Sequence, residues 1–403
     1  MSPKKTIHLI AAARPNFMKI APLYHALSRE PWANPVIVHT GQHYDTNMSD
    51  AFFRDLLLPV PHYHLGIGSG THAEQTGKVM IAYERLLNET RPDLVVVVGD
   101  VNSTLACTLA TVKIRYADRP SGGGRRFPLP GNVNRAIRPL VAHLEAGLRS
   151  FDRSMPEEIN RIVTDTLADI LWTPSADGNE NLLWEGVSRE KIERVGNIMI
   201  DSLEMMRPRI EKIRMANQYG LEQGAYGLVT LHRPVNVDDP AQLEAICAAL
   251  EKITQTLPLV FPVHPRTRKQ LEQDGFWQVL AKTPNLFLSE PLPYLQFMSL
   301  VFDSYLVITD SGGVQEETTY LGIPCLTLRE NTERPVTVSE GTNRLCTVET
   351  LLQHIAKATA SKERRSTKPL LWDGRTADRV VASIRNVLLG TERGVSADKA
   401  SPS

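Results

Sequence analysis

Residues 304–318, "SYLVITDSGGVQEET", join an apolar run to a glycine turn and then to a polar segment. The run is typical of a buried strand, and the turn at Ser311–Gly313 opens the pattern of a helix. A helix that begins in this way directs free N–H groups outward, and these favour an anion such as phosphate. Glu316 and Glu317 follow at once, although a carboxylate repels phosphate. The ligand therefore has to suit both a glycine turn and a carboxylate.

The same order of apolar run, turn and amphipathic segment repeats along the chain. The runs are continuous rather than alternating, which indicates strands covered by helices on both faces of a sheet. Ten runs fall into two groups, and their alternation with helical patterns predicts two parallel, doubly wound α/β sheets. The expected strands are 6–11, 35–39, 94–98, 139–144 and 169–173 in the first group, and 226–231, 258–263, 285–288, 305–309 and 323–327 in the second.

The two groups of strands predict two domains with a join near residues 195–220. We expect the first domain over residues 1–195 and the second over residues 196–374. Residues 375–392 have an amphipathic helical pattern, and residues 393–403 are expected to form a disordered tail.

Residues 117–138 interrupt the alternation of strand and helix patterns. They contain three consecutive glycines, three prolines and five arginines. This composition is typical of a long surface loop. The segment lies between a helical pattern and the start of a strand, and ligands of such sheets bind at the opposite edge. We therefore expect the loop to be dispensable for chemistry.

Composition excludes several classes of function. The 403 residues include 45 basic and 45 acidic side chains, so no basic excess indicates nucleic acid or an anionic membrane as a partner. Four cysteines without paired spacing favour a reducing compartment over a disulfide framework or a zinc site. The uninterrupted apolar run before Arg14 has five residues, too short for a signal peptide or a membrane span. These observations predict a cytoplasmic protein.

Ionisable residues follow six of the expected strands, at the sheet edge where ligands bind. A structural strand end would carry capping and turn residues, whereas histidine and arginine recur here. Taken alone, Asp100 also fits a helix N-cap. We leave Glu158 out, because an acidic residue in the first helical turn after a proline is common. The candidates are Arg14, Lys19, Asp100, Glu145, His232, His264 and Glu317.

The glycine turn and its neighbours favour a nucleoside diphosphate linked to a sugar. Arg14, Lys19 and Arg334 offer positive charge for phosphate. Glu317 lies one turn beyond the glycines and suits ribose hydroxyls, whereas Glu316 is expected to point elsewhere. The stretch matches neither G-x-G-x-x-G nor a Walker loop, so NAD binding and ATP hydrolysis are not indicated.

Ten motifs in order resemble the non-hydrolysing UDP-N-acetylglucosamine 2-epimerases over nearly the whole chain. They are ARPNFMKIAPL, TGQHYD, VVVVGDVNSTLA, HLEAGLRS, MPEEINR, GNIMIDSL, TLHRPVNVDD, VFPVHPRT, ITDSGGVQEET and LRENTERP. The resemblance implies the GT-B fold: two Rossmann-like domains with the active site in the cleft between them, and helix 375–392 packed back on the first domain. It implies a UDP-sugar substrate, no NAD or other cofactor, no metal, and a homodimer that serves cell-surface polysaccharide precursor synthesis.

The chemistry of that family implies interconversion of UDP-GlcNAc and UDP-ManNAc. UDP is eliminated in anti fashion to give 2-acetamidoglucal and is then added to the other face. Which carboxylate removes the proton from carbon 2 stays open. By motif, the catalytic residues would be Asp100, Glu145, Glu157, His232 and Lys19. The UDP contacts would be Arg14, His264, Phe297, Ser311, Gly312, Gly313, Glu317 and Arg334.

Two motifs depart from the family pattern. Residues 231–235 read LHRPV where many members carry GHRRE. Residues 42–45 read QHYD where many bacterial members carry Gln-His-Arg followed by Glu or Gln. These positions help to hold a second, regulatory UDP-GlcNAc in some members, so we do not expect that activation here.

Four other functions stay open at this point. The altered pocket leaves room for a related UDP-diacetamido sugar or uronic acid. A GT-B glycosyltransferase would share the UDP site, but it would need fewer proton-transfer groups than this chain has. A hydrolysing epimerase and a catalytically inactive UDP-sugar sensor are the remaining alternatives.

Overall fold

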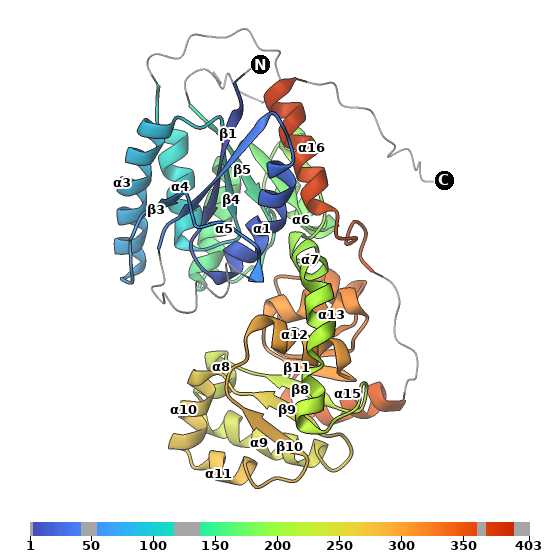
Figure 1. The fold of residues 1–403 in the computed structure, drawn as a ribbon. Helices are drawn as coiled ribbons and strands as arrows, with labels where there is room; N and C mark the ends of the chain where they lie inside the picture. Colours follow the sequence, from blue (N-terminus) through green and yellow to red (C-terminus); the bar gives the residue numbers. More distant parts are fainter. Residues whose placement is uncertain (1–2, 42–54, 117–137, 361–367, 391–403) are drawn as a thin grey trace.

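The computed structural model describes residues 3–41, 55–116, 138–360 and 368–390. These residues form two α/β lobes joined by one long helix (Figure 1). The expected loop 117–138, apart from Arg138, lies outside the described residues. The expected tail 393–403 and the departing motif at 42–45 lie outside them as well.

The first lobe is built on a seven-stranded parallel sheet in the order β3-β2-β1-β4-β5-β6-β7. Its strands are β1 Lys5–Ala11, β2 Ala33–His39, β3 Tyr63–His64, β4 Leu94–Val98, β5 Leu140–Leu144, β6 Ile170–Thr173 and β7 Ile192–Arg194. Its helices include α1 Arg14–Ser28, α3 His72–Thr90, α4 Asn102–Lys113, α5 Pro156–Leu167 and α6 Ala176–Trp184, with a 3₁₀ turn at Arg189–Lys191.

The second lobe is built on a six-stranded parallel sheet in the order β10-β9-β8-β11-β12-β13. Its strands are β8 Gly227–Thr230, β9 Leu259–Pro262, β10 Leu286–Ser289, β11 Leu306–Thr309, β12 Cys325–Leu328 and β13 Asn343–Cys346. Its helices are α8 Pro234–Val237, α9 Pro240–Ile253, α10 Pro265–Gln273, α11 Phe276–Leu280, α12 Tyr294–Asp303, α13 Gly312–Leu321, α14 Val336–Ser339 and α15 Val348–Ala360, with a 3₁₀ turn at Met215–Tyr219 before β8.

The prediction of two parallel α/β sheets is confirmed, and each of the ten expected strands is present. Three further strands, β3, β7 and β13, were not predicted. All three lie at a sheet edge, where one side of the strand is open and residues are partly exposed. The continuous apolar run that identifies an inner strand is therefore missing from them.

Strand order fixes where each sheet offers a crevice. In the first sheet, β1 lies between β2 and β4, so the connections that leave β1 and β4 diverge. In the second sheet, β8 lies in the same way between β9 and β11. Ligands of open parallel sheets bind at such points, beyond the carboxyl ends of the strands. The segments after β1, β4, β8 and β11 are therefore placed for binding.

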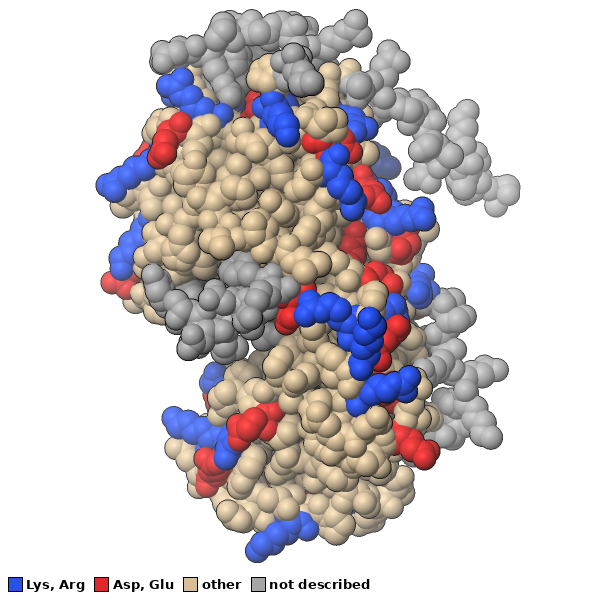
Figure 2. Space-filling model, viewed as in Figure 1, with Lys and Arg blue, Asp and Glu red and all other residues tan. Residues whose placement is uncertain are grey.

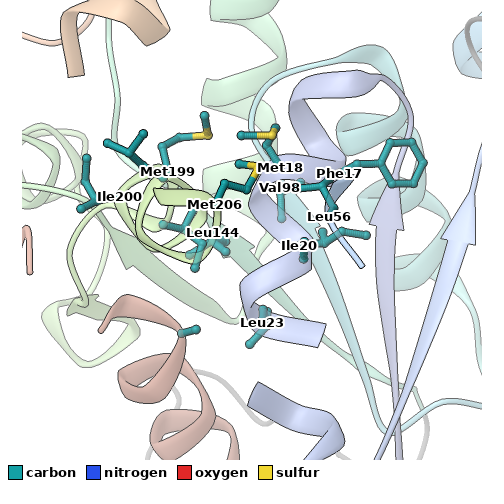
Figure 3. Close-up of a cluster of buried hydrophobic side chains, with 14 of the residues drawn as sticks. Phe17, Met18, Ile20, Leu23, Leu56, Val98, Leu144, Met199, Ile200 and Met206 are labelled. Carbon is teal, nitrogen blue, oxygen red and sulfur yellow. The ribbon is translucent and has the colours of Figure 1, made fainter. Parts of the chain in front are cut away.

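Helix α7, Ile198–Ile213, connects the two lobes (Figure 1). It packs against α1 of the first lobe and against α12 and α13 of the second. Figure 3 shows Met199 and Met206 of α7 close to Met18 of α1. These residues belong to a buried apolar cluster that continues from the first sheet into the second. The lobes therefore share part of one hydrophobic core along α7.

Helix α16, Thr376–Leu389, lies against α1 and α7 (Figure 1). Two contacts hold it there. The buried Trp172 Nε1 of β6 donates to Ser383 Oγ at 3.0 Å. The carboxylate of Asp201 on α7 accepts the N–H groups of Thr376 at 3.1 Å and Ala377 at 2.7 Å. Asp201 thus binds the first N–H groups of α16, which lack partners within the helix.

All four cysteines are buried, and burial raises the pKa of Cys325 to about 11 and that of Cys247 and Cys346 to about 12. Basic and acidic side chains are interspersed on the face shown in Figure 2. Among the described residues, none of the helices combines the length and the apolar character that crossing a membrane requires.

Candidate functional site

A cleft of about 540 Å³ is lined by residues of both lobes, beyond the carboxyl ends of their strands. Ligand sites in proteins have volumes of roughly 300–1,000 Å³, so the cleft has room for a nucleotide sugar. It brings together most of the residues that the sequence singled out. Those that line it are Lys19, Asp100, Glu145, Glu157, His232, Phe297, Ser311, Gly312, Gly313, Glu317 and Arg334.

Among the predicted residues whose side chains the structure describes, His264 does not line this cleft. His264 is an exposed residue at the start of α10, and its ring centroid lies 5.4 Å from that of His232. It therefore lies beside a lining residue. Arg14 is the first residue of α1, directly after β1, and its side chain is outside the described part of the structure.

Lys19 of α1 and Glu145, which follows β5, form a buried ion pair on the cleft wall. Gly99 permits this approach, because a Cβ at Gly99 would lie 2.8 Å from Lys19 Nζ. Glu145 itself has a φ of +74°, a left-handed conformation that is strained for a side chain of this size. Such strain persists where the surrounding structure enforces it, and it concentrates at functional sites.

Asp100 is held by Arg161, a buried residue of α5 that also pairs with Glu158. Glu158 accepts the N–H groups of Ser150 at 3.1 Å and Phe151 at 2.9 Å. Burial raises the pKa of Glu158, but the hydrogen bonds from Ser150 and Arg161 outweigh it and lower that pKa overall. Glu158, which was left out of the candidates, is not among the residues that line the cleft; it is a buried anion that fixes the arginine beside Asp100.

Glu157, the neighbour of Glu158, lies half-buried on the cleft wall. Both glutamates belong to the first turn of α5, which begins at Pro156. One of them therefore faces the cleft while the other supports the wall behind it.

His232 follows β8 and is oriented by Asp310, a fully buried residue that follows β11. His232 Nδ1 lies 2.8 Å from Asp310 Oδ1, and the backbone N–H groups of His232 and Arg233 donate to Asp310 Oδ2 at 2.9 and 2.8 Å. Burial opposes ionisation of Asp310, but the contacts with His232 and the backbone N–H groups lower its pKa overall. Within the described part of the chain, this pairing leaves Nε2 of His232 without a hydrogen-bond partner.

The start of α13 has the features expected of an anion site. Ser311 is the N-cap, but its side chain accepts no hydrogen bond from the helix N–H groups. A Cβ at Gly312 would lie 2.7 Å from an Arg334 nitrogen, so glycine lets Arg334 approach the helix end. A Cβ at Gly313 would have no neighbour within 4 Å among the described atoms. Free N–H groups and an arginine are therefore placed side by side, as phosphate requires.

Glu317 lies one turn further into α13 and accepts a 2.7 Å hydrogen bond from the Tyr294 hydroxyl. Burial raises the pKa of Glu317 to about 7, although the bond from Tyr294 opposes the rise. Glu316 diverges from Glu317 toward Asn197 and Arg334, but it lines the same cleft. The cleft wraps around the first turns of α13 and is therefore reached by neighbouring side chains that diverge by about 100°.

Several lining residues escaped the reasoning from sequence. Arg161 and Glu333 stand inside recognised motifs, but their charges read as surface charges because a one-dimensional pattern does not report burial. Asp310 stands between an expected strand and a glycine turn. Aspartate is common at such a position as a helix cap, so its identity alone does not indicate a functional role. The lining residues that were not among the candidates include Arg161, Arg233, Tyr294, Glu316 and Glu333.

Comparison with known proteins agrees with this geometry. The family model described as UDP-N-acetylglucosamine 2-epimerase matches residues 25–385. The UDP-N-acetylglucosamine 2-epimerase of Methanocaldococcus jannaschii is 38% identical over 384 residues, 93% of this chain and 97% of that protein. The UDP-2,3-diacetamido-2,3-dideoxy-D-glucuronate 2-epimerase of Pseudomonas aeruginosa is 40% identical over 340 residues, 83% of this chain and 86% of that protein.

Solved structures give the same result. The crystal structure of the Methanocaldococcus jannaschii epimerase in complex with UDP-GlcNAc and UDP matches with a TM-score of 0.79, over 94% of this chain and 99% of that one. A lipopolysaccharide outer core galactosyltransferase matches with a TM-score of 0.54 at 13% identity, which shows a likeness of fold alone.

Proposed function

Since the chain belongs to the UDP-N-acetylglucosamine 2-epimerase family and is an isomerase, we propose that its substrates are UDP-GlcNAc and UDP-ManNAc, which it interconverts. The observation that carries the proposal is the composition of the cleft. One wall, at α13, has an anion site next to a carboxylate, and the other wall has several groups able to transfer protons. A nucleotide sugar bound across the cleft would place its UDP on the first wall and its sugar on the second.

UDP binding is assigned to the second lobe. The N–H groups at Gly312 and Gly313, the Ser311 hydroxyl and the Arg334 guanidinium would hold the diphosphate. Glu317 would accept hydrogen bonds from the ribose hydroxyls, and Phe297 would lie by the uracil. Arg14 and His264 complete the proposed UDP contacts on the basis of motif and position.

The sugar is assigned to the first lobe, where Asp100, Glu145 and Glu157 face the cleft. One of these carboxylates would take the proton from carbon 2. The bond between carbon 1 and the UDP oxygen would break with its electron pair leaving on UDP, and a double bond would form between carbons 1 and 2. UDP would then add back while a proton is delivered to the other face of carbon 2.

Two contacts support this division of roles. Asp310 orients His232, so that the imidazole can serve as a proton donor to the departing diphosphate. Lys19 pairs with Glu145 and holds this carboxylate on the cleft wall, where a base would be needed.

Deuterium exchange tests the reaction. The enzyme is incubated with UDP-GlcNAc in deuterated water and the products are followed by NMR. Deuterium at carbon 2 of UDP-linked ManNAc is the expected result. Free sugar would indicate hydrolysis, transfer to an added acceptor would indicate a glycosyltransferase, and an unchanged substrate would contradict the proposal.

A second candidate substrate is a UDP-diacetamido uronic acid, because the Pseudomonas aeruginosa relative named for that activity is 40% identical. The two candidates are separated by kcat/KM measured with both UDP-sugars on the same preparation. A higher value for UDP-GlcNAc supports the first proposal, and a higher value for the uronic acid supports the second.

Three further properties belong to the proposal: a cytoplasmic location, a homodimer, and a role in supplying precursors of cell-surface polysaccharide. The four buried reduced thiols support a reducing compartment. Light scattering on the purified protein tests the dimer, and cell fractionation tests the location.

A further inference from the structure

Glu316 is a buried carboxylate at the centre of the cleft to which the proposed reaction assigns no role. It stands in the second turn of α13 and is 1% exposed, yet it is part of the cleft lining. Its neighbour Glu317 is assigned to ribose and lies beside Tyr294. Glu316 instead projects toward the groups of the first lobe.

The two oxygens of Glu316 have different surroundings. Oε1 accepts a 2.9 Å hydrogen bond from Asn197 Nδ2 and lies 3.0 Å from Arg334 Nε. Oε2 is buried and has no hydrogen-bond partner among the residues that the structure describes. A buried carboxylate oxygen without a donor is costly, so a ligand that supplies an O–H or N–H group gains from filling this position.

A second unpartnered oxygen lies on the opposite wall. Glu145 Oε2 is occupied by Lys19, whereas Oε1 is buried and has no hydrogen-bond partner in the described part of the chain. Burial raises the pKa of Glu316, the positive charges of Arg334 and Lys19 lower it, and the negative charge of Glu145 raises it further. Glu316 is therefore close enough to the Lys19–Glu145 pair to interact with its charges, although it sits on the UDP-binding helix.

These contacts place Glu316 where the diphosphate site meets the sugar site. Arg334, on one side of it, is the arginine at the phosphate-binding helix end, and Glu145, on the other, belongs to the proton-transfer set. The part of a UDP-sugar that passes between them is the pyranose ring, whose hydroxyl groups are hydrogen-bond donors. The unpartnered Oε2 thus has the acceptor chemistry that this part of the ligand needs.

We propose that Glu316 is a sugar-binding residue, an inference that rests on the proposed function. Its Oε2 accepts a hydrogen bond from a hydroxyl of the N-acetylhexosamine ring, while its Oε1 holds Arg334 and Asn197. The same carboxylate thus aligns the sugar with the diphosphate, so that the bond to be broken lies between the two walls of the cleft.

The test compares Glu316→Gln with Glu333→Gln. Both glutamates pair with Arg334, Glu333 through a 2.5 Å contact, so both substitutions perturb the phosphate-binding arginine. Only Glu316 is proposed to touch the sugar. Affinities for UDP and for UDP-GlcNAc are measured by calorimetry, together with kcat and KM. UDP binding also reports that each variant is folded.

We expect E316Q to weaken UDP-GlcNAc binding by about 10-fold more than UDP binding, since a hydrogen bond to a charged group is lost. E333Q should weaken both ligands by the same factor. E316D, which keeps the charge but withdraws it by one methylene group, should repeat the sugar-selective loss. If both Glu316 variants weaken UDP and UDP-GlcNAc equally, Glu316 merely supports Arg334 and the inference is wrong. If the wild-type enzyme neither binds nor converts UDP-GlcNAc, the proposed function fails instead.

Discussion

The pair formed by His232 and Asp310 shows how one buried side chain determines what a catalytic candidate can do. The motif argument reached His232 because histidine is unusual after a strand. It passed over Asp310, because aspartate is common between a strand and a helix. In the folded chain β8 and β11 are neighbours, so the residues that follow them meet. Sequence separation hid this contact, and the order of the strands revealed it.

The role of Asp310 is tested by Asp310→Asn. An amide cannot reproduce both the contact with His232 Nδ1 and all of the N–H groups that converge on Asp310. We expect kcat to fall by about 100-fold, the usual scale for a general acid–base group, while UDP still binds. Steady-state kinetics and UDP calorimetry on the same sample check this. A near-normal kcat would remove the pair from the mechanism.

Glu317 predicts a pH dependence of substrate binding. Ribose hydroxyls need an ionised carboxylate as acceptor, and burial raises the pKa of Glu317 to about 7. The free enzyme therefore carries a protonated Glu317 below that pH, and binding must first remove the proton. The apparent KM for UDP-GlcNAc should rise as the pH falls through about 7. Glu317→Gln serves as control. This variant should bind UDP-GlcNAc more weakly at every pH, and its KM should not rise as the pH falls through about 7.

At the scale of elements, the inner strands and the edge strand β10 could be predicted, whereas the edge strands β3, β7 and β13 could not. The run LVVVV at 94–98 is apolar on both faces because helices cover both sides of β4. Residues 192–194, Ile-Glu-Arg, form β7 without such a run, since pairing with β6 on one side is enough. Glu316 diverges from Glu317 as the helical angle predicts. That it also lines the cleft could not be predicted, because the width of the cleft around α13 is a property of the packed molecule.

The contact between Asp201 and α16 predicts a matched pair of stability effects. Asp201→Ala leaves the buried N–H groups of Thr376 and Ala377 without their acceptor. We expect the free energy of unfolding to fall by about 1–3 kcal/mol. Asp378→Ala, in the first turn of the same helix, removes an exposed ion pair with Arg29 and should cost at most about 0.5 kcal/mol. Denaturant titrations of both variants measure these free energies. Equal losses of stability would contradict the prediction, because they would indicate a general effect on the helix rather than the loss of a buried cap.

At the scale of the molecule, the site is divided between two sheets of the same strand order. Each lobe offers a crevice where its strand order reverses, and the proposed reaction uses groups from both crevices. We therefore propose that the lobes close on the substrate to exclude water, with α7 and the junction near residue 196 as the hinge. The division into domains 1–195 and 196–374, with α16 on the first, belongs to the same proposal.

The segment between α4 and β5 gives a prediction at this scale. Its flanking residues lie at the end of α4 and before β5, whereas the cleft is lined by Asp100 and Glu145, which follow strands. In a parallel sheet, the carboxyl ends of the strands lie on one side and the amino ends lie on the opposite side. Replacing residues 118–136 with a short Gly-Ser linker should leave kcat/KM unchanged. Loss of turnover in a variant that keeps the wild-type melting temperature would show that this placement is wrong.

The burial of all four cysteines has a practical consequence for observing lobe motion. Thiols that are buried and have a raised pKa offer little thiolate to a maleimide dye. Cysteines introduced at two exposed positions, Trp184 on the first lobe and Val279 on the second, would therefore be labelled selectively in an otherwise native chain. Energy transfer between a donor and an acceptor at these positions would report the distance between the lobes, molecule by molecule, as UDP-sugar is added.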